Sequence, residues 1–193
     1  VLTANEDGKD NGCIINTAIQ AAGEPNQVSI SVSKKNYTHD MIMRTGKFTV
    51  SSLTEKADFS LFKRFGFQSG KDNDKFLGFD GWLRGINGVP YITESCNAYI
   101  SVKVEKTVDL GSHTLFIGEV TDMEVLSEDS SVTYEFYQKN IKPKPEKVGT
   151  TPKGETVWRC IICGYEYVGE ELPEDFICPW CKHPASDFEK IVR

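Results

Sequence analysis

The sequence predicts a mainly-β protein, with an antiparallel β-barrel and a few short helices followed by a small C-terminal metal-binding domain. Within residues 1–138, several short segments alternate apolar and polar residues, as half-buried strands do. Turn residues separate these segments, and few stretches have helical spacing, which favours a barrel over an α/β fold. Near the C-terminus, residues 160–181 contain two C-x2-C pairs, which is typical of a site for one metal ion.

The expected barrel elements follow one another in a simple order. Val28, Ile30 and Val32 alternate with serines, which indicates a strand with one buried face. A turn at 109–112 joins two further segments into a predicted hairpin. Strands are expected at 13–19, 28–33, 48–53, 89–92, 100–105, 113–120 and 132–137. The glycine-rich, aromatic stretch 76–88 receives no assignment.

Two helices are expected among these strands. The first starts with Thr38 as its cap and ends near Gly46. The second covers residues 55–66, where Phe59, Phe62 and Phe65 are three residues apart. Such a stripe is more typical of a helix face in the core than of a cofactor-binding motif.

Composition divides the chain further. Residues 139–155 are rich in Lys and Pro and have no apolar period, so we expect a semi-extended linker between a barrel domain at 1–138 and a small domain at 156–193. The segment 1–7 is typical of a strand entered part-way rather than of a signal peptide, so we expect residues before Val1.

Charge and composition exclude several classes of function. The formal net charge of −6 disfavours nucleic acid and anionic membranes as partners. No apolar run is long enough for a transmembrane helix, and no G-x-G-x-x-G or P-loop motif occurs. Cys13 and Cys96 lie outside the C-x2-C pairs, and we expect them to be buried free thiols in a reducing, cytoplasmic protein.

The C-terminal cysteines form the strongest motif in the sequence. Each C-x2-C pair closes a turn that directs two thiolates to one point, so Cys160, Cys163, Cys178 and Cys181 are the expected ligands of a tetrahedral ion. Four sulfurs suit either Zn(II) or iron. Aromatic residues surround them and favour a redox iron in a dry shell: Trp158, Tyr165, Tyr167, Phe176, Trp180 and Phe188.

These motifs resemble the rubredoxin family. The similar segments are Trp158–Tyr167, Leu172–Phe176, Cys178–Cys181 and Asp187–Glu189, with a shortened stretch between the cysteine pairs. The resemblance implies one mononuclear iron that cycles between Fe(II) and Fe(III) by single electrons.

Polar residues at two places in the barrel domain are candidates for ligand binding. The serines of segment 28–33 lead into Lys34, Lys35, Asn36 and Thr38, and such groups at a strand-to-helix junction can hold a phosphate. A solvated loop explains the same residues. Asn16 to Gln20 at a strand end are equally compatible with structural capping. A lone histidine such as His113 is more often a surface or core residue than a functional one.

A second resemblance covers nearly all of residues 1–138. Segments 12–20, 28–39, 46–50 and 111–120 are similar to the flavin-reductase-like FMN-binding split barrels, flavoredoxin in particular. This resemblance implies an FMN bound near a homodimer interface, with His113 close to the flavin or the nicotinamide. It places Asn16, Thr17, Ala18 and Ile19 along the isoalloxazine ring. It places Ser31, Ser33, Lys35, Asn36 and Thr38 around the ribityl chain and phosphate.

The order of the two domains resembles the high molecular weight rubredoxins of anaerobic bacteria. The resemblance implies that electrons pass from NADH through FMN and iron to a flavodiiron protein that reduces nitric oxide or dioxygen. A flavin suits this task because NADH releases two electrons as a hydride whereas a single iron takes one. Three alternatives remain open: an electron carrier reduced by a separate reductase, a flavin reductase with a structural zinc ribbon, and a non-enzymatic zinc-ribbon interaction module on a barrel without a cofactor.

Overall fold

The structure of the chain is a computed structural model that describes residues 1–143, 156–180 and 183–192. The chain divides into two compact units, Val1–Ile141 and Lys142–Arg193. The described part of the chain contains no helix that is both long and apolar enough to cross a membrane.

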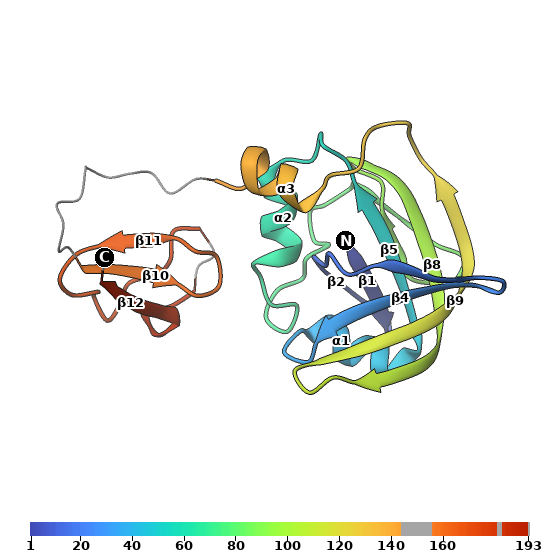
Figure 1. Ribbon diagram of the computed structural model, residues 1–193, viewed down its shortest axis with the longest axis horizontal. Helices are drawn as coiled ribbons and strands as arrows, with labels where there is room; N and C mark the ends of the chain where they lie inside the picture. Colours follow the sequence, from blue (N-terminus) through green and yellow to red (C-terminus); the bar gives the residue numbers. More distant parts are fainter. Residues whose placement is uncertain (144–155, 181–182, 193) are drawn as a thin grey trace. The chain divides into compact units, whose positions relative to one another are not determined.

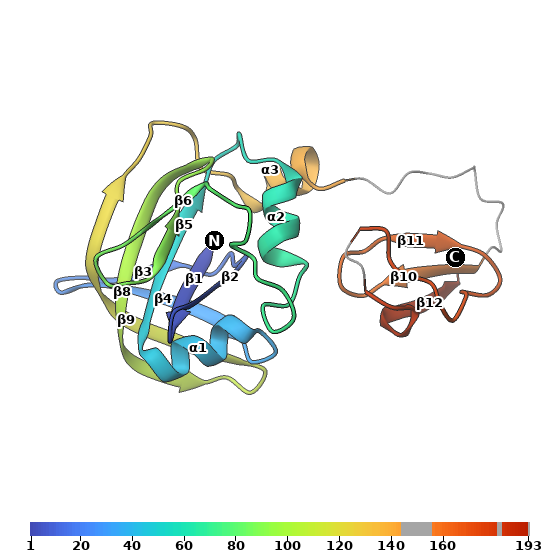
Figure 2. The same ribbon diagram turned by 180° about the vertical axis from the view of Figure 1, so that it is seen from behind.

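Unit 1 is built on one curled antiparallel sheet of seven strands in the order β2-β1-β5-β8-β9-β4-β3 (Figures 1 and 2). This is the mainly-β barrel that the sequence predicts. The strands of this sheet are β1 Leu2–Glu6, β2 Lys9–Cys13, β3 Ile19–Gly23, β4 Asn26–Ser33, β5 Lys47–Leu53, β8 Cys96–Asp109 and β9 His113–Val125. A second sheet pairs β6 Trp82–Arg84 with β7 Pro90–Ile92.

The core of the barrel lies between the inner face of the sheet and α1 (Tyr37–Thr45). Val28, Ile30 and Val32 on β4 are buried, so the predicted alternation is confirmed. From α1, Met41 and Ile42 enter this core and are almost fully buried. At about 25 cal/mol per Å² of buried apolar surface, side chains of this size contribute roughly 1.5–3 kcal/mol each.

A second apolar cluster surrounds α2 (Phe59–Gly66). Phe62 and Phe65 are buried and Phe59 packs against the cluster, so the predicted phenylalanine stripe is a core face. The helix begins at Asp58, whose side chain accepts a hydrogen bond from the backbone N–H of Ser60.

The predicted strand at 13–19 is wrong. β2 ends at Cys13 and β3 begins at Ile19, and these two strands form the opposite edges of the seven-stranded sheet. Residues 14–18 must therefore cross from one edge to the other. A segment that crosses between edges has no neighbouring strand to pair with, whatever its apolar content.

The predicted strand at 132–137 is also wrong. This segment forms the short helix α3 (Tyr134–Phe136), and a π-helical turn continues it through residues Tyr137–Ile141. Thr133 caps it by accepting a hydrogen bond from the N–H of Phe136, and the ring of Tyr137 packs 4.4 Å from that of Phe62. The helical turn occupies residues 139–141, where the linker was expected to begin; residues 144–155 of that linker lie outside the described part.

The helix α1 starts two residues earlier than predicted. Asn36, rather than Thr38, is the N-cap, and its side-chain oxygen accepts a hydrogen bond from the N–H of Thr38. Thr38 is fully buried and its hydroxyl accepts a hydrogen bond from Asn11. The helix ends as predicted at Gly46, which has a positive φ of 66°.

The predicted hairpin is confirmed as β8 and β9, whose register shifts twice. Gly118 on β9 approaches β8 so closely that a Cβ there would lie 2.3 Å from the carbonyl oxygen of Lys103.

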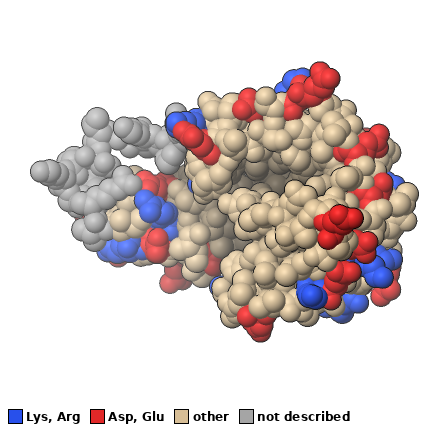
Figure 3. All heavy atoms as spheres, turned by 45° about the vertical axis from the view of Figure 1, so that its right-hand side comes forward, with Lys and Arg blue, Asp and Glu red and all other residues tan. Residues whose placement is uncertain are grey.

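On the face shown in Figure 3, Lys, Arg, Asp and Glu side chains lie mainly toward the margins of unit 1, around a hollowed and mostly uncharged centre.

Unit 2 contains a three-stranded antiparallel sheet in the order β11-β10-β12. Its strands are β10 Thr156–Cys160, β11 Glu166–Val168 and β12 Phe188–Val192, and a 3-10 turn at Ala185–Asp187 precedes β12. Such a small unit has little room for an apolar core. Its aromatic residues and its cysteines therefore carry much of its stabilisation.

Candidate functional site

Unit 2 brings three predicted ligands together. Cys160 is the last residue of β10, Cys163 follows in a turn, and Cys178 lies just after the isolated bridge between Ile177 and Pro184. The three Sγ atoms lie within 4.8 Å of one another, and all three residues are buried. Cys181, the fourth predicted ligand, lies outside the described residues.

Local backbone geometry explains how the cysteines converge. Gly164 adopts a positive φ of 78°, which a residue with a side chain rarely adopts, and its N–H donates to the carbonyl of Cys160 at 2.8 Å. The N–H of Cys178 donates to the carbonyl of His183, also at 2.8 Å. Each turn therefore keeps its backbone polar groups paired while it directs sulfur inward.

An aromatic cluster packs beside the cysteines. Phe176 packs edge-on against Phe188 at 5.4 Å and lies 4.9 Å from Tyr167. Tyr165 packs edge-on against Trp180, also at 5.4 Å. Buried thiolates in a dry aromatic surrounding fit a soft metal ion and limit the access of water to it. The residues present therefore fit the predicted iron.

In unit 1, the first group of predicted flavin residues lies on the crossing segment and on β4 beside it. Thr17, in the crossing segment, donates a hydrogen bond from its hydroxyl to the carbonyl of Ser31 at 2.8 Å and accepts one from the N–H of the same residue. This double contact fixes the crossing segment to β4. Asn16, Ala18 and Ile19 lie on either side of Thr17 in the chain, and all three are exposed.

The next group lies where β4 turns into α1. Ser33 is the cross-strand partner of His113 on β9, and its hydroxyl accepts a hydrogen bond from the N–H of Lys35. Asn36 caps α1 at the same turn. The structure thus brings Ser33, Lys35, Asn36 and His113 together. It places the side chain of Thr38 apart from them, buried against Asn11.

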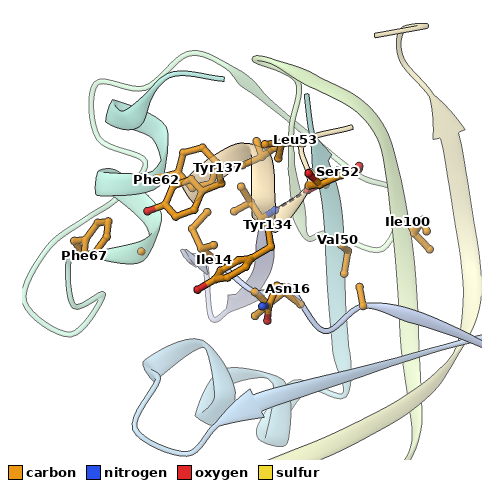
Figure 4. A pocket seen from close by; sticks show the side chains of 17 residues that line it. Ile14, Asn16, Val50, Ser52, Leu53, Phe62, Phe67, Ile100, Tyr134 and Tyr137 are labelled. Atoms are coloured by element: carbon orange, nitrogen blue, oxygen red, sulfur yellow. Dashed lines mark hydrogen bonds between the residues drawn. The ribbon is translucent and has the colours of Figure 1, made fainter. Parts of the chain in front are cut away.

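A cavity of about 680 Å³ opens between the crossing segment, β5, α2 and α3 (Figure 4). Of the predicted flavin residues, Asn16 and Ala18 line it. The remaining lining residues are Val1, Ile14, Ile15, Val50, Ser51, Ser52, Leu53, Phe62, Gly66, Phe67, Ile100, Val132, Thr133, Tyr134 and Tyr137.

The sequence interpretation missed Tyr134 and Tyr137 because it assigned their segment to a strand. A helical signal was present, since Thr133 precedes the segment as a potential cap and the two tyrosines are three residues apart. Phe62 was recognised as a core residue, and in the structure it also lines the cavity.

Cys13 and Cys96 are buried free thiols, as predicted. Burial raises the pKa of both thiols, that of Cys96 to about 11. Lys75 is buried near Cys13, and its ammonium group donates to the carbonyls of Gly12 at 2.7 Å and Phe65 at 3.1 Å. Burial lowers the pKa of Lys75 to about 8.

Comparison with known families covers both units. The flavin reductase like domain family matches residues 1–144, and the rubrerythrin, rubredoxin-like domain family matches residues 158–189. The second match covers the three clustered cysteines and Cys181.

Individual relatives match different shares of this chain. A high molecular weight rubredoxin of Moorella thermoacetica is 32% identical over 99% of this chain and 94% of its own length. A ferric-chelate reductase (NAD(P)H) of Archaeoglobus fulgidus is 35% identical over 82% of this chain and 89% of its own. An FMN-binding protein from Thermus thermophilus has a similar fold, with a TM-score of 0.59 and 23% identity over 65% of this chain and 68% of that one.

Proposed function

The chain belongs to the flavin reductase like domain family and carries a rubredoxin-like domain at its C-terminal end, and from this premise we propose that it is an NADH-linked oxidoreductase for electron transfer. In this proposal FMN in unit 1 receives electrons from NADH and one iron in unit 2 passes them on to an acceptor protein. The observation that carries it is the cluster of Cys160, Cys163 and Cys178 in the same chain as the barrel.

The two cofactors divide the chemistry between them. Bound FMN supplies the exchange between a two-electron donor and one-electron acceptors, and thiolate-bound iron takes up one electron at a time. Because both sites belong to one chain, the linker keeps them at a high effective concentration.

The residues of unit 1 account for FMN binding in two parts. At the β4–α1 turn, Ser33 and Lys35 offer a hydroxyl and a cation, and the first N–H groups of α1 lie nearby, which together suit a phosphate. Thr17 holds the crossing segment on β4, which positions Asn16 and Ala18 for the ring. His113 lies at the phosphate end of these residues, since it pairs with Ser33.

The residues of unit 2 hold the iron and exclude water. We propose Cys181 as the fourth ligand beside the three clustered cysteines. Backbone hydrogen bonds at Gly164 and Cys178 keep the ligand turns in place for either oxidation state. A site that changes its geometry little between oxidation states exchanges electrons with little reorganisation.

The resemblance to high molecular weight rubredoxins supports the finer parts of the proposal. We propose that the acceptor is a flavodiiron protein that reduces nitric oxide or dioxygen, that the chain forms a homodimer, and that it acts in the cytoplasm. The domain arrangement proposed is a barrel at 1–138, a linker at 139–155 and a rubredoxin domain at 156–193.

Anaerobic titration of the purified protein with NADH tests the central part. We expect NADH alone to bleach both the flavin and the iron absorption. If the protein stays oxidised until a separate NADH-dependent reductase is added, it is an electron carrier only. Metal analysis that finds zinc in place of iron would instead leave a flavin reductase with a structural zinc ribbon.

A further inference from the structure

The cavity beside the crossing segment has a chemistry that the electron-transfer proposal does not use. None of the seventeen described residues that line it is Asp, Glu, Lys, Arg or His. Its walls are mainly aliphatic and aromatic, from β5, α2 and α3. A cavity of about 680 Å³ with such walls suits a small neutral ligand. Its side chains offer no cation to a pyrophosphate or to an anionic metal chelate.

The aromatic side chains favour a ligand with a flat ring. Tyr137 packs against Phe62 at 4.4 Å and lies 6.4 Å from Tyr134. Tyr134 lines the cavity and is 63% exposed (Figure 4). An exposed aromatic face at the rim of an apolar cavity favours stacking with a planar partner.

Two neutral polar groups project into the same cavity. The side-chain amide of Asn16 and the hydroxyl of Tyr134 have no hydrogen-bond partner among the described residues, and Figure 4 shows both side chains at the cavity. Amide and hydroxyl groups donate hydrogen bonds to carbonyl oxygens without requiring a charge on the ligand.

The cavity also adjoins the proposed flavin ring. Asn16 and Ala18 line it and belong to the segment proposed to contact the isoalloxazine. A ligand in the cavity therefore lies beside the electron source, and this step rests on the proposed function.

From these observations we propose that the cavity binds a small neutral quinone and that the protein reduces it with NADH. Each turnover converts the two carbonyl groups of the quinone into two hydroxyl groups. Two electrons and one proton leave NADH as the hydride, and water supplies the second proton. Tyr134 stacks on the quinone ring, and the side-chain amide of Asn16 donates a hydrogen bond to one of its oxygens.

The test uses the full-length holoprotein and duroquinone, whose ring carries four methyl groups and so does not add thiols. Binding is measured by saturation-transfer NMR without NADH, and reduction by NADH oxidation under anaerobic conditions. We expect Tyr134→Ala to weaken binding and raise KM about tenfold, and Tyr134→Phe, which keeps the stacking ring, to bind like the wild type. Anthraquinone-2,6-disulfonate, which carries two negative charges, should show no saturation transfer.

Tyr91→Phe is the matched control, because Tyr91 is a largely buried tyrosine outside the cavity lining and stacks on Tyr99. It should bind duroquinone like the wild type. Equal duroquinone binding by wild type and Tyr134→Ala would overturn the proposal. The proposal would also be overturned if NADH bleaches the iron of the protein but duroquinone is not reduced. That result would not contradict the electron-transfer function. If NADH reduces neither iron nor quinone, both proposals fail.

Discussion

Lys34 forms an ion pair with Asp109, with 2.7 Å between Nζ and Oδ1. This contact lowers the pKa of the Asp109 carboxyl. It also pairs the charge of Lys34 with a carboxylate at the β8–β9 turn. Its neighbour Lys35 has no ion pair with any described residue. Of these two lysines at the β4–α1 turn, Lys35 is therefore the one whose charge is available to a phosphate.

Replacing Lys35 by Ala should weaken FMN binding. The change removes a charge-assisted hydrogen bond, and because the lysine is exposed we expect an effect at the low end of the usual range, a Kd raised about tenfold. Fluorescence quenching during titration of the apoprotein with FMN measures it. Lys34→Ala is the matched control and should leave Kd nearly unchanged. Equal effects of the two substitutions on Kd would contradict the assignment of Lys35 to the FMN phosphate.

Replacing Cys178 by Ser should abolish iron binding and leave the barrel intact. The hydroxyl is a poor substitute for a thiolate, and Sγ of Cys178 lies only 3.4 Å from Sγ of Cys163. Iron content and visible absorption should fall to background while FMN content stays constant, because unit 1 has its own apolar core. As control, Cys96→Ala changes a buried thiol outside the cluster and should retain iron. Loss of FMN together with iron in the Cys178 variant would contradict this independence.

Replacing Gly118 by Ala should destabilise unit 1. The added Cβ would meet the carbonyl oxygen of Lys103 at 2.3 Å and a methyl carbon of Val102 at 2.6 Å, so the two longest strands must move apart. Overpacking of this kind costs about 1–3 kcal/mol of the free energy of unfolding. Chemical denaturation followed by far-UV circular dichroism measures the loss. Gly23→Ala, where a Cβ meets no atom within 4 Å, is the control and should change stability by less than about 0.5 kcal/mol.

The burial of Lys75 should appear in the pH dependence of stability. Burial lowers the pKa of Lys75 from 10.5, the ordinary value of a lysine, to about 8 in the folded chain, so between these values the unfolded chain binds more protons. Stability attributable to Lys75 therefore rises with pH across this window. Cys96 and Tyr99 act in the opposite direction, because their pKa values are raised to about 11 and about 12.

A difference measurement isolates the contribution of Lys75. We expect the free energy of unfolding of the wild type to increase relative to that of Lys75→Met between pH 8 and 10, measured in denaturant at fixed ionic strength. Lys103→Met, which alters an exposed lysine, should run parallel to the wild type. If the free energy of unfolding of the wild type and of Lys75→Met changes with pH in the same way, burial does not lower the pKa of Lys75.

Local patterns in the sequence were sufficient for much of the fold. Three of these patterns depend only on residues close in sequence: the alternation on β4, the turn between β8 and β9, and the phenylalanine stripe of α2. The metal cluster was equally predictable, because the C-x2-C spacing itself determines the ligand turns. By contrast, residues 14–18 were assigned to a strand because apolar content does not reveal which edge of the sheet the next strand joins.

The candidate site was predictable in the same uneven way. Ser33 and His113 were identified separately, but only the register of β4 with β9 shows that they are neighbours. Thr38 has a hydroxyl at the expected position in the sequence, yet the packing of α1 buries it against Asn11. The cavity formed by α2 and α3 depends on contacts between residues far apart in the chain, such as Phe62 and Tyr137, which local patterns do not encode.

The central claim is that electrons from NADH reach the iron by way of the flavin. Anaerobic stopped-flow absorbance of the purified protein mixed with NADH tests it most directly, with flavin and iron followed at separate wavelengths. We predict that flavin reduction precedes or accompanies the bleaching of iron, and that protein stripped of FMN keeps its iron oxidised. Iron that bleaches before the flavin, or at the same rate without FMN, would contradict the account.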